Sequence, residues 1–281
     1  MAKAGVVAEE RAPMIAVLEE CDIDPAVQLS TSAGWNQTAS DWRMLMQLSP
    51  DGCFGIHGDG NLVATATLMR YDRRLGWIGM VLTHADYRRR GFARALFEHV
   101  VEHADALRIE SLKLDATDQG QPLYESLGFR MEQVVERWWR RGDSEAPRPH
   151  DRGQLAGPSA GMDLEAFGAD RSRLFQELSE QSAVFASNDG FAFLRPGVRA
   201  SYAGPCVARN AEAARGFLEA CIREAGPSGC FWDLPARNGA AAELACELGF
   251  LRQRRLVRMV RGAPCAGRED WIYGIAGFEL G

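Results

Sequence analysis

Residues 86–104 read DYRRRGFARALFEHVVEHA, so that three arginines run into a glycine directly before an amphipathic segment. Apolar residues recur after the glycine at helical spacing; they are Ala93, Leu96, Phe97, Val100, Val101 and Ala104. The first N–H groups of a helix have no acceptor within it and carry partial positive charge. Adding cations there costs free energy unless an anion binds, and Gly91 lets the backbone approach one closely.

An apolar stretch, WIGMVLTH at 77–84, comes before the basic turn and predicts a strand. A strand, a glycine-containing basic turn and a helix N-terminus form the usual phosphate site of α/β proteins. Taken alone, the arginines are equally typical of a solvated basic turn. The order of the three elements favours a pyrophosphate site.

The composition sets limits on the class of protein. The chain has 281 residues, a formal net charge of −6 and 46% hydrophobic residues, as expected for two globular cores. The negative charge argues against nucleic acid as the main partner, and no apolar run approaches the roughly 20 residues of a membrane span. Seven scattered cysteines without a C-x-x-C pair indicate reduced thiols and no metal site. We expect a cytoplasmic protein.

The chain contains an internal repeat. Residues 112–142 and 230–262 both run apolar strand, Asp, polar turn, short helix, Leu-Gly-Phe, apolar strand, Arg-Gly. Such a joint match favours duplication over the chance recurrence of a helix, a glycine cap and a strand. Between the copies, residues 143–161 are rich in Gly, Pro and charge and read as a linker. We predict two domains of one fold, at 1–142 and 162–281.

The order of elements in the first domain predicts its fold class. Two helices are expected on either side of a loop at 30–38, followed by strands with a hairpin turn GDGN at 58–61. The amphipathic helix follows, and then a strand at 111–115, a helix at 119–127 and a strand at 130–140. This order indicates an α+β domain with a mostly antiparallel sheet.

The basic turn and its surroundings resemble a known family. MVLTHADYRRRGFARAL (80–96) is similar to motif A, the acetyl-CoA site of the GCN5-related N-acetyltransferases (GNAT), whose signature Gln/Arg-x-x-Gly-x-Gly/Ala is met by Arg88, Gly91 and Ala93. PLYESLGF (122–129) resembles motif B of the same family. The resemblance covers most of residues 13–141 and implies the GNAT fold with acetyl-CoA as co-substrate.

The resemblance also implies roles for residues. Tyr124 matches the tyrosine that donates a proton to the departing CoA thiolate; without the motif, a packed aromatic on a short helix would be the better interpretation. The strand end would pair with the pantetheine arm. The implied cofactor-binding residues are Val81, Leu82, Thr83, Arg88, Arg89, Arg90, Gly91, Phe92, Ala93, Arg94 and Thr117.

Two positions depart from the family pattern. Thr117 stands where an asparagine is common, seven residues before the tyrosine, and Trp77 stands where some members carry the glutamate that acts as general base. The attacking amine must be neutral, so a base is needed elsewhere. The residue types leave open His84, Asp115, Asp118 and a water chain.

The acceptor site is predicted in the loop between the first two helices. This loop, STSAGWNQTASDW at 30–42, holds Trp35, Asn36 and Gln37, an aromatic beside two amides in an irregular segment. An alternative interpretation has Trp35 packing between the helices and Asn36 or Thr38 capping the second one.

The second domain lacks the features of the site. In the repeat alignment, Ala245 stands where Tyr124 does and Asn238 opposite Thr117, and the helix at 211–225 follows no basic glycine turn. It resembles the C-terminal domain of tandem bacterial acetyltransferases of the YitH type. We expect a degenerate domain that binds no CoA. It either walls the acceptor pocket, with CFWDLP (230–235) near the interface, or covers an edge of the first sheet.

These observations favour an N-acetyltransferase that transfers the acetyl group directly to the primary amine of a small molecule. No cysteine lies in either motif, so nothing indicates an acetyl-enzyme. The acidic balance slightly favours a cationic or polar amine. A non-catalytic acyl-CoA sensor and transfer of a longer acyl group are the alternatives.

Overall fold

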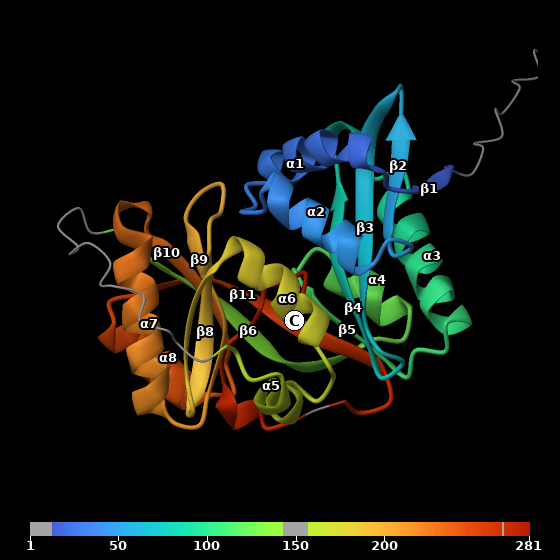
Figure 1. Cartoon of the computed structure of the whole chain (residues 1–281). Coiled ribbons are helices and arrows are strands. Elements are labelled where there is room, and N and C mark those ends of the chain that lie inside the picture. The colour runs from blue at the N-terminus through green and yellow to red at the C-terminus, as the bar shows by residue number, and fades with distance from the viewer. Residues whose placement is uncertain (1–12, 143–156, 266) are drawn as a thin grey trace, which may run out of the picture.

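The computed structural model describes residues 13–142, 157–265 and 267–281, and the predicted linker lies mostly outside these ranges. We call residues 13–142 the first half and residues 157–281 the second half. Twelve strands of both halves join in one sheet, in the order β1-β2-β3-β4-β5-β11-β6-β10-β9-β8-β7, with β12 beside β9. Figure 1 shows helices on both sides of this sheet.

The first half forms the elements that the sequence predicts. Asp59 and Gly60 (φ 52° and 79°) make the hairpin turn between β2 and β3, as the GDGN motif requires. Its strands are β1 (Ile15–Val17), β2 (Cys53–Gly58), β3 (Asn61–Tyr71), β4 (Leu75–Thr83), β5 (Ser111–Ala116) and β6 (Arg130–Arg140). Its helices are η1 (Glu20–Asp22), α1 (Ile23–Ser32), α2 (Ala39–Leu48), η2 (Ala85–Tyr87), α3 (Phe92–Ala106) and α4 (Gln121–Ser126).

The second half repeats this order without a strand before its first helices and with an additional strand, β12, after its last long one. The Leu-Gly-Phe triplet again follows a short helix and leads into a long strand. Its helices are α5 (Ala160–Phe167), α6 (Ser172–Gln181), α7 (Ala211–Ala225), η3 (Gly226–Ser228), α8 (Gly239–Glu247) and η4 (Glu269–Trp271). Its strands are β7 (Ala183–Ser187), β8 (Gly190–Arg195), β9 (Ser201–Ala208), β10 (Cys230–Pro235), β11 (Leu251–Gly262) and β12 (Ile272–Gly274).

The two halves exchange their last long strands. β11 of the second half pairs with β5 of the first, and β6 of the first half pairs with β10 of the second. β11 and β6 then pair with each other at the centre of the sheet. Each half therefore completes the other's sheet, so the predicted domain boundaries do not separate two independent sheets. The exchange also leaves no unpaired strand edge between the halves.

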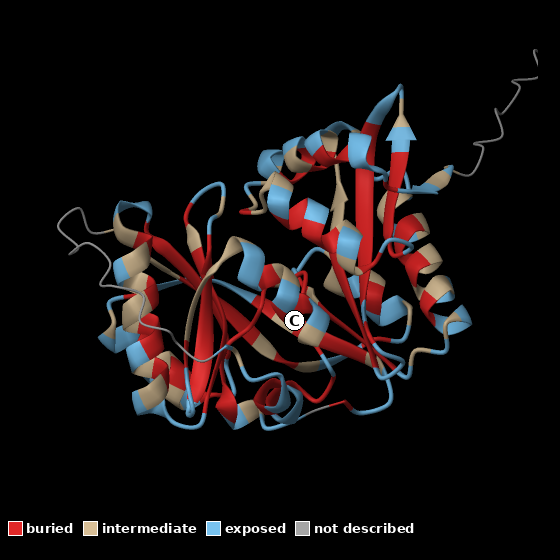
Figure 2. Ribbon diagram, viewed as in Figure 1, coloured by how far each residue is buried: buried red, intermediate tan, exposed pale blue. Residues whose placement is uncertain are grey.

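Most residues of the long strands are buried (Figure 2), and hydrophobic clusters pack on both faces of the sheet. One cluster contains residues of both halves, among them Trp42, Trp77, Phe191 and Phe193, and underlies α1, α2, α5 and α6. On the opposite face, α3 and α4 cover a cluster of the first half that Met259 of β11 joins, whereas α7 and α8 cover a cluster of the second half that Trp138 of β6 joins. The shared cluster makes the stability of each half depend on the other.

The C-terminal segment ends against the first half. After β12 the chain crosses to β3 and β4, where the hydroxyl of Tyr71 donates to the carbonyl oxygen of Leu280 at 2.6 Å. The guanidinium of Arg171 donates to the carbonyl oxygen of Gly281 at 2.7 Å. In Figure 1 the label C lies between the two halves. We call residues 275–281 the C-terminal tail.

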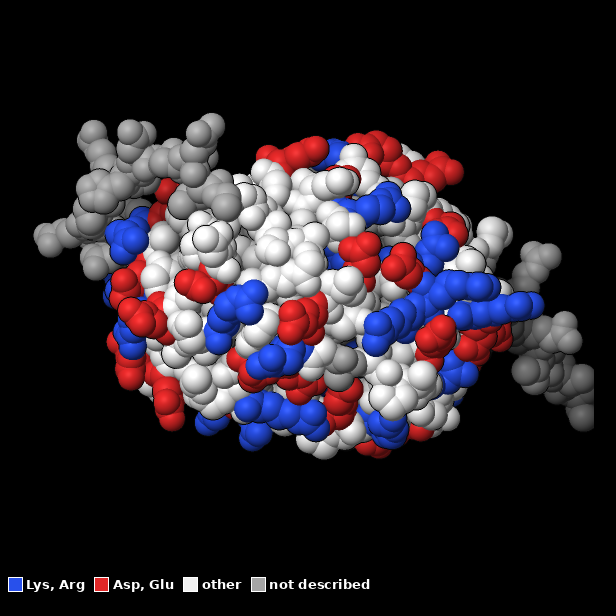
Figure 3. Space-filling model, turned by 60° about the horizontal axis from the view of Figure 1, so that its bottom comes forward, with Lys and Arg blue, Asp and Glu red and all other residues white. Residues whose placement is uncertain are grey.

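The surface carries charge of both signs. Figure 3 shows Lys and Arg interspersed with Asp and Glu on one face, with a larger basic group toward one side. In the described ranges, no helix is both long and apolar enough to cross a membrane. All seven cysteines are free thiols, and five of them are buried.

Candidate active site

The strands β4 and β5 separate at the site. They pair in parallel only over Leu75–Trp77 and Ser111–Lys113 and then diverge. A bulge in the pairing of β3 with β4 bends β4 at Met80, whose φ is 48° and whose carbonyl oxygen accepts from the Thr65 hydroxyl at 2.8 Å. The bulge explains the divergence, because an extra residue bends a strand and breaks its ladder.

A cavity of about 420 Å³ lies where the strands diverge. All six residues at 78–83 of β4 line it. Since successive residues of a strand point to opposite faces, the cavity passes through the sheet along the free side of β4. One end is lined by Arg88 and Ala93 at the start of α3, and the other by Trp35, Gln37 and the tail.

The start of α3 presents a row of free amides. Gly91 adopts the left-handed conformation (φ 80°), as does Arg89 (φ 62°), and α3 begins at Phe92 without a side-chain cap. The backbone N–H groups of residues 89–94 find no acceptor within the described part of the chain. A side chain at Gly91 would meet no atom within 4 Å. Such an open row of donors suits a pyrophosphate group.

The arginines of the turn lie around these amides and are exposed. Arg88 donates to the carbonyl oxygen of Thr83 at 3.4 Å and lines the cavity. Arg90 donates to the carbonyl oxygen of Asp86 at 3.1 Å, and Arg94 pairs with Glu98 at 3.2 Å. Five of the predicted cofactor-binding residues lie beside the cavity but do not line it: Arg89, Arg90, Gly91, Phe92 and Arg94.

Tyr124 lines the cavity from α4. Its ring packs against Phe97, with 4.5 Å between the ring centroids, and its hydroxyl lies next to the space at Gly120. The hydroxyl has no hydrogen-bond partner among the described residues. Burial raises the pKa of Tyr124 to about 12, so the phenol keeps its proton at neutral pH and can donate it.

Two buried polar atoms at the cavity lack a partner among the described residues: Thr83 Oγ1 and Gln37 Oε1. Both residues line the cavity. Leaving such atoms unpaired is costly unless a ligand or water satisfies them. Thr117 also lines the cavity and accepts from the Gly120 amide through Oγ1 at 3.3 Å.

The three residues predicted to bind the acceptor have different positions. Trp35 and Gln37 line the cavity, but Asn36 does not. The amide of Asn36 donates to Ala200 O at 3.0 Å and accepts from Arg199 N at 2.9 Å, so it fastens the loop to the second half. Thr38, with Asp41, caps α2, as the alternative interpretation had it. Asn36 therefore lies outside the cavity.

The candidates for the general base differ in access. His84 caps η2 and does not line the cavity, and Asp118 is exposed outside it. Asp115 lines the cavity, but Arg258 binds both its oxygens at 2.9 Å. Burial raises the pKa of Asp115 although Arg258 opposes the shift. None of the three is an uncommitted base at the cavity.

A carboxylate that the sequence analysis missed lies at the acceptor end. Glu279, in the tail, lines the cavity beside Gly79, where an added Cβ would come within 2.7 Å of the Glu279 Cα. It accepts from Gln37 Nε2 at 3.1 Å and from Arg195 at 3.1 Å. Burial raises the pKa of Glu279, although the Arg195 cation opposes the shift. Glu279 is part of the terminal GFELG of the sequence. Nothing in the sequence signalled its contact with Gly79 of β4, because the two residues are 200 positions apart.

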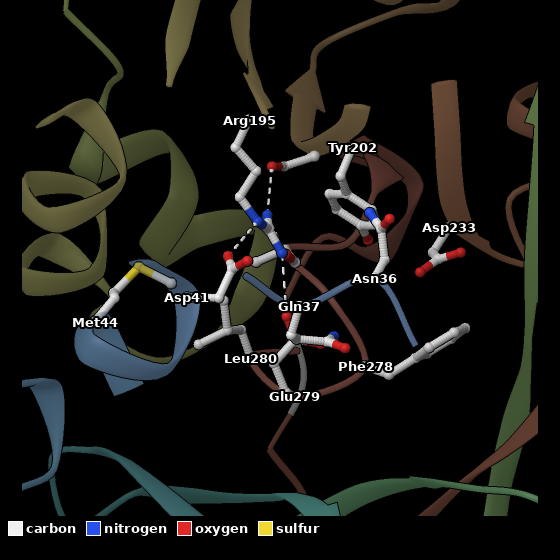
Figure 4. Close-up of polar contacts among 12 residues, drawn as sticks. Asn36, Gln37, Asp41, Met44, Arg195, Tyr202, Asp233, Phe278, Glu279 and Leu280 are labelled. Carbon is white, nitrogen blue, oxygen red and sulfur yellow. Dashed lines mark hydrogen bonds and ion pairs between the residues drawn. The ribbon is translucent and has the colours of Figure 1, made fainter. Parts of the chain in front are cut away.

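Figure 4 shows Arg195 between Asp41 and Glu279. Arg195 is buried, and it also donates to the carbonyl oxygens of Ala276 and Gly204. Its carboxylate partners come from α2 and from the tail, so one guanidinium joins the cap of α2 to the acceptor end of the cavity. The acceptor end of the cavity is also lined by Arg137, Arg254, Leu256 and Phe278.

The corresponding gap in the second half is filled. β9 and β10 also pair in parallel over only three residues, Ser201–Ala203 and Cys230–Trp232. β12 then lies on β9, and Ile275 N donates to Asp233 O at 2.9 Å. The start of α7 is capped by its own Asn210, and Asn238 caps α8 and donates to Ile272 O at 3.0 Å.

A larger hollow, of about 1170 Å³, lies between the β3–β4 hairpin and α6. It contains none of the predicted site residues. In the described ranges, no three His, Cys, Asp or Glu residues form a group able to hold a metal ion. The predicted site residues that line either of these two cavities of the described chain lie at the smaller one.

Comparisons with known proteins agree with this architecture. The model of the acetyltransferase (GNAT) family matches residues 18–129, and that of an acetyltransferase (GNAT) domain matches 160–274. The uncharacterized N-acetyltransferase YitH of Bacillus subtilis is 26% identical over 83% of this chain and 86% of its own.

Solved structures show the same fold. A protein from Pyrococcus horikoshii superposes with a TM-score of 0.82 at 23% identity, over 95% of both chains. A tandem GNAT protein from the clavulanic acid biosynthesis pathway gives a TM-score of 0.60 at 14% identity, over 89% of this chain and 99% of that one. Both halves of the chain are thus GNAT domains, and the chain belongs to the GNAT family of N-acetyltransferases.

Proposed function

We propose that this protein transfers the acetyl group of acetyl-CoA directly to the primary amine of a small molecule bound between the two halves. The observation that carries the proposal is the row of free amides at residues 89–94, which opens next to a cavity that passes through the sheet. Acetyl-CoA supplies an activated acetyl thioester.

The amides of residues 89–94 would bind the pyrophosphate, with Arg88, Arg89, Arg90 and Arg94 adding positive charge. Along β4, the backbone of Val81, Leu82 and Thr83 has no strand partner on the side of β5. This free strand side suits an extended pantetheine arm. The unpaired Thr83 Oγ1 is a further hydrogen-bonding group there.

Two groups would handle protons at opposite ends of the reaction. Glu279 accepts a proton from the attacking nitrogen, and the free Gln37 Oε1 accepts a hydrogen bond that orients the amine. The C–N bond forms as the C–S bond breaks, and Tyr124 donates its proton to the departing sulfur. Glu279 then releases its proton to solvent, whereas Tyr124 regains one.

The second half would contribute walls and Glu279 but no second cofactor site. β12 occupies the gap between β9 and β10, and Ala245 is buried at the position of Tyr124. The two roles expected for this half are compatible. The tail walls the pocket, and β11 covers an edge of the first sheet.

Calorimetric titration with acetyl-CoA tests the proposal. We expect one molecule bound per chain, followed by release of free CoA thiol when a panel of small amines is added. Two molecules per chain would show that the second half is a working site. Acetyl-CoA binding without CoA release for any amine would instead favour an acyl-CoA sensor, and no binding would refute the assignment of the amide row.

A further inference from the structure

Arg254 is a cation at the acceptor end of the cavity for which the described chain provides no counter-ion. β11 carries five arginines, and four of them pair with a carboxylate. Arg252 and Arg255 pair with Glu136 at 3.0 and 3.5 Å, and Arg258 and Arg261 pair with Asp115 and Asp105 at 2.9 and 2.8 Å. No described hydrogen-bond or ion-pair partner exists for Arg254, whose guanidinium lies 5.2 Å from the centre of the Phe278 ring.

The neighbour of Arg254 across the sheet is another arginine. β11 and β6 place Arg254 directly opposite Arg137, and β6 and β10 place Arg137 opposite Asp233. Asp233 binds Arg137 with both oxygens, at 2.7 and 2.6 Å. The row of three residues thus holds two guanidinium groups and one carboxylate. Both oxygens of this carboxylate already accept hydrogen bonds from Arg137. Like charges opposite each other destabilise a sheet, so the pairing of β11 with β6 gains no ion pair from Arg254.

The surroundings of Arg254 favour the arrival of an anion. Its side chain is exposed, but it stands in the recess that the cavity forms. Desolvation in this recess and, second, the Arg137 cation lower the pKa of Arg254 to about 10. Both causes penalise the positive charge, and an oxyanion beside the guanidinium would relieve both.

The other carboxylates at this end already have an arginine as ion-pair partner. Glu279 is bound by Arg195, and Asp115, deeper in the cavity, is bound by Arg258. An acceptor therefore meets a carboxylate that can take the proton of its amine and, apart from it, one free cation.

We propose that the acceptor is an amine that carries an oxyanion, a carboxylate or phosphate, at its other end, and that Arg254 binds this group. The proposal rests on the proposed function in placing the amine beside Glu279. It differs from the slight preference for a cationic or polar amine that the net charge of −6 suggested, because it rests on the local charges of the cavity.

The test compares amines that differ only in the distal group. The probes are β-alanine, γ-aminobutyrate and ε-aminocaproate, their uncharged carboxamides, and aminoethyl phosphate. Binding is measured by saturation-transfer NMR with and without CoA, and turnover by CoA release from acetyl-CoA. We expect an acid to bind and react in preference to its amide; carboxylate and phosphate probes distinguish the two sources of the oxyanion.

Arg254→Gln should weaken binding of the preferred acid by about 10- to 100-fold, the range of a lost charged hydrogen bond, and leave its amide unchanged. Arg255→Gln is the matched control, since it removes the neighbouring charge on the other face of β11 and should leave the preference intact. Arg254→Gln should melt at the wild-type temperature or above it, because it removes the repulsion from Arg137.

Equal binding of acids and amides, or an Arg254→Gln variant that still prefers acids, would overturn the proposal. It would also be overturned if Arg254→Gln changed only the choice between acetyl-CoA and succinyl-CoA, because the anion would then belong to the donor. Arg254→Glu should shift the preference to putrescine, whose distal group is a cation. If the wild-type protein bound the acidic probes but not acetyl-CoA, the proposed function would be refuted, whereas the assignment of Arg254 as an oxyanion-binding residue would stand.

Discussion

The indole Nε1 of Trp77, in the first part of β4, donates to the carbonyl oxygen of Phe278 at 2.9 Å and so fastens the C-terminal tail across the acceptor end of the cavity. The next residue of the tail is Glu279. Trp77 thus stands on β4 where some members of the family carry a carboxylate. Its indole instead holds the tail in place, so that Glu279 of the second half lies close to this position. Gly79 provides the space for this approach.

Trp77→Phe is expected to loosen this attachment. The ring is fully buried and Phe fills much of its volume, but the Phe278 carbonyl loses its donor, which costs about 1 to 3 kcal/mol. Denaturant unfolding measures the loss. The rate of transfer should fall while acetyl-CoA affinity stays unchanged, since the amide row is on the other side of β4.

Glu279→Gln keeps the size of the side chain and its place beside Gly79 but cannot accept a proton. We expect turnover to fall by about 10²- to 10⁴-fold, the range of general acid–base catalysis. The wild-type rate should rise with pH through a pKa above the ordinary value for Glu, because burial raises the pKa of Glu279. An unchanged rate and pH profile in Glu279→Gln would exclude it as the base.

Gly91→Glu is expected to abolish acetyl-CoA binding while the fold is retained. No atom lies within 4 Å of the added Cβ, but the carboxylate would compete with the pyrophosphate for the free amides. Gly91→Ala introduces the cost of the positive φ without a carboxylate that competes with the pyrophosphate. This variant should bind acetyl-CoA more weakly than wild type but still measurably. Gly216→Glu, at an exposed position of α7, matches the change in charge and should bind like wild type.

Tyr124→Phe should bind acetyl-CoA with wild-type affinity and release CoA about 10²- to 10⁴-fold more slowly. Since the pKa of Tyr124 is about 12, the wild-type rate should show no loss between pH 7 and 10. A fall in that range that disappears in Tyr124→Phe would mean that the phenol titrates there and that burial does not protect its proton.

Arg195→Met leaves two buried carboxylates, Asp41 and Glu279, without their shared cation. Removing one partner of a buried ion pair costs about 3 to 5 kcal/mol. In the variant, the pKa of folded Glu279 lies further above its unfolded value, so the folded state binds more protons in this range. Stability should therefore fall as the pH rises through that interval. Unfolding at pH 5 and pH 8 checks the sign: the deficit against wild type should be larger at pH 8.

The sequence reasoning worked best where signals are local. The period of Ala93, Leu96 and Phe97 placed α3, because a helix repeats every 3.6 residues regardless of its partners. GDGN placed the β2–β3 turn for the same reason, since the required backbone conformation depends on those residues alone. Asn36 was the misleading residue: an amide in a loop has the same sequence signature whether it binds a substrate or another loop.

What the sequence determined by itself was the order of elements, the repeat and the basic turn before α3, and its resemblance to a known family indicated the GNAT fold. Only the tertiary structure decided that β6 and β11 change places, that β12 fills the second gap, and that Glu279 and Arg254 reach the first one. The reason is one of range. Helix periods, turns and caps are set by residues a few positions apart, whereas strand pairing and cavity walls depend on burial and charge contacts between residues more than a hundred positions apart.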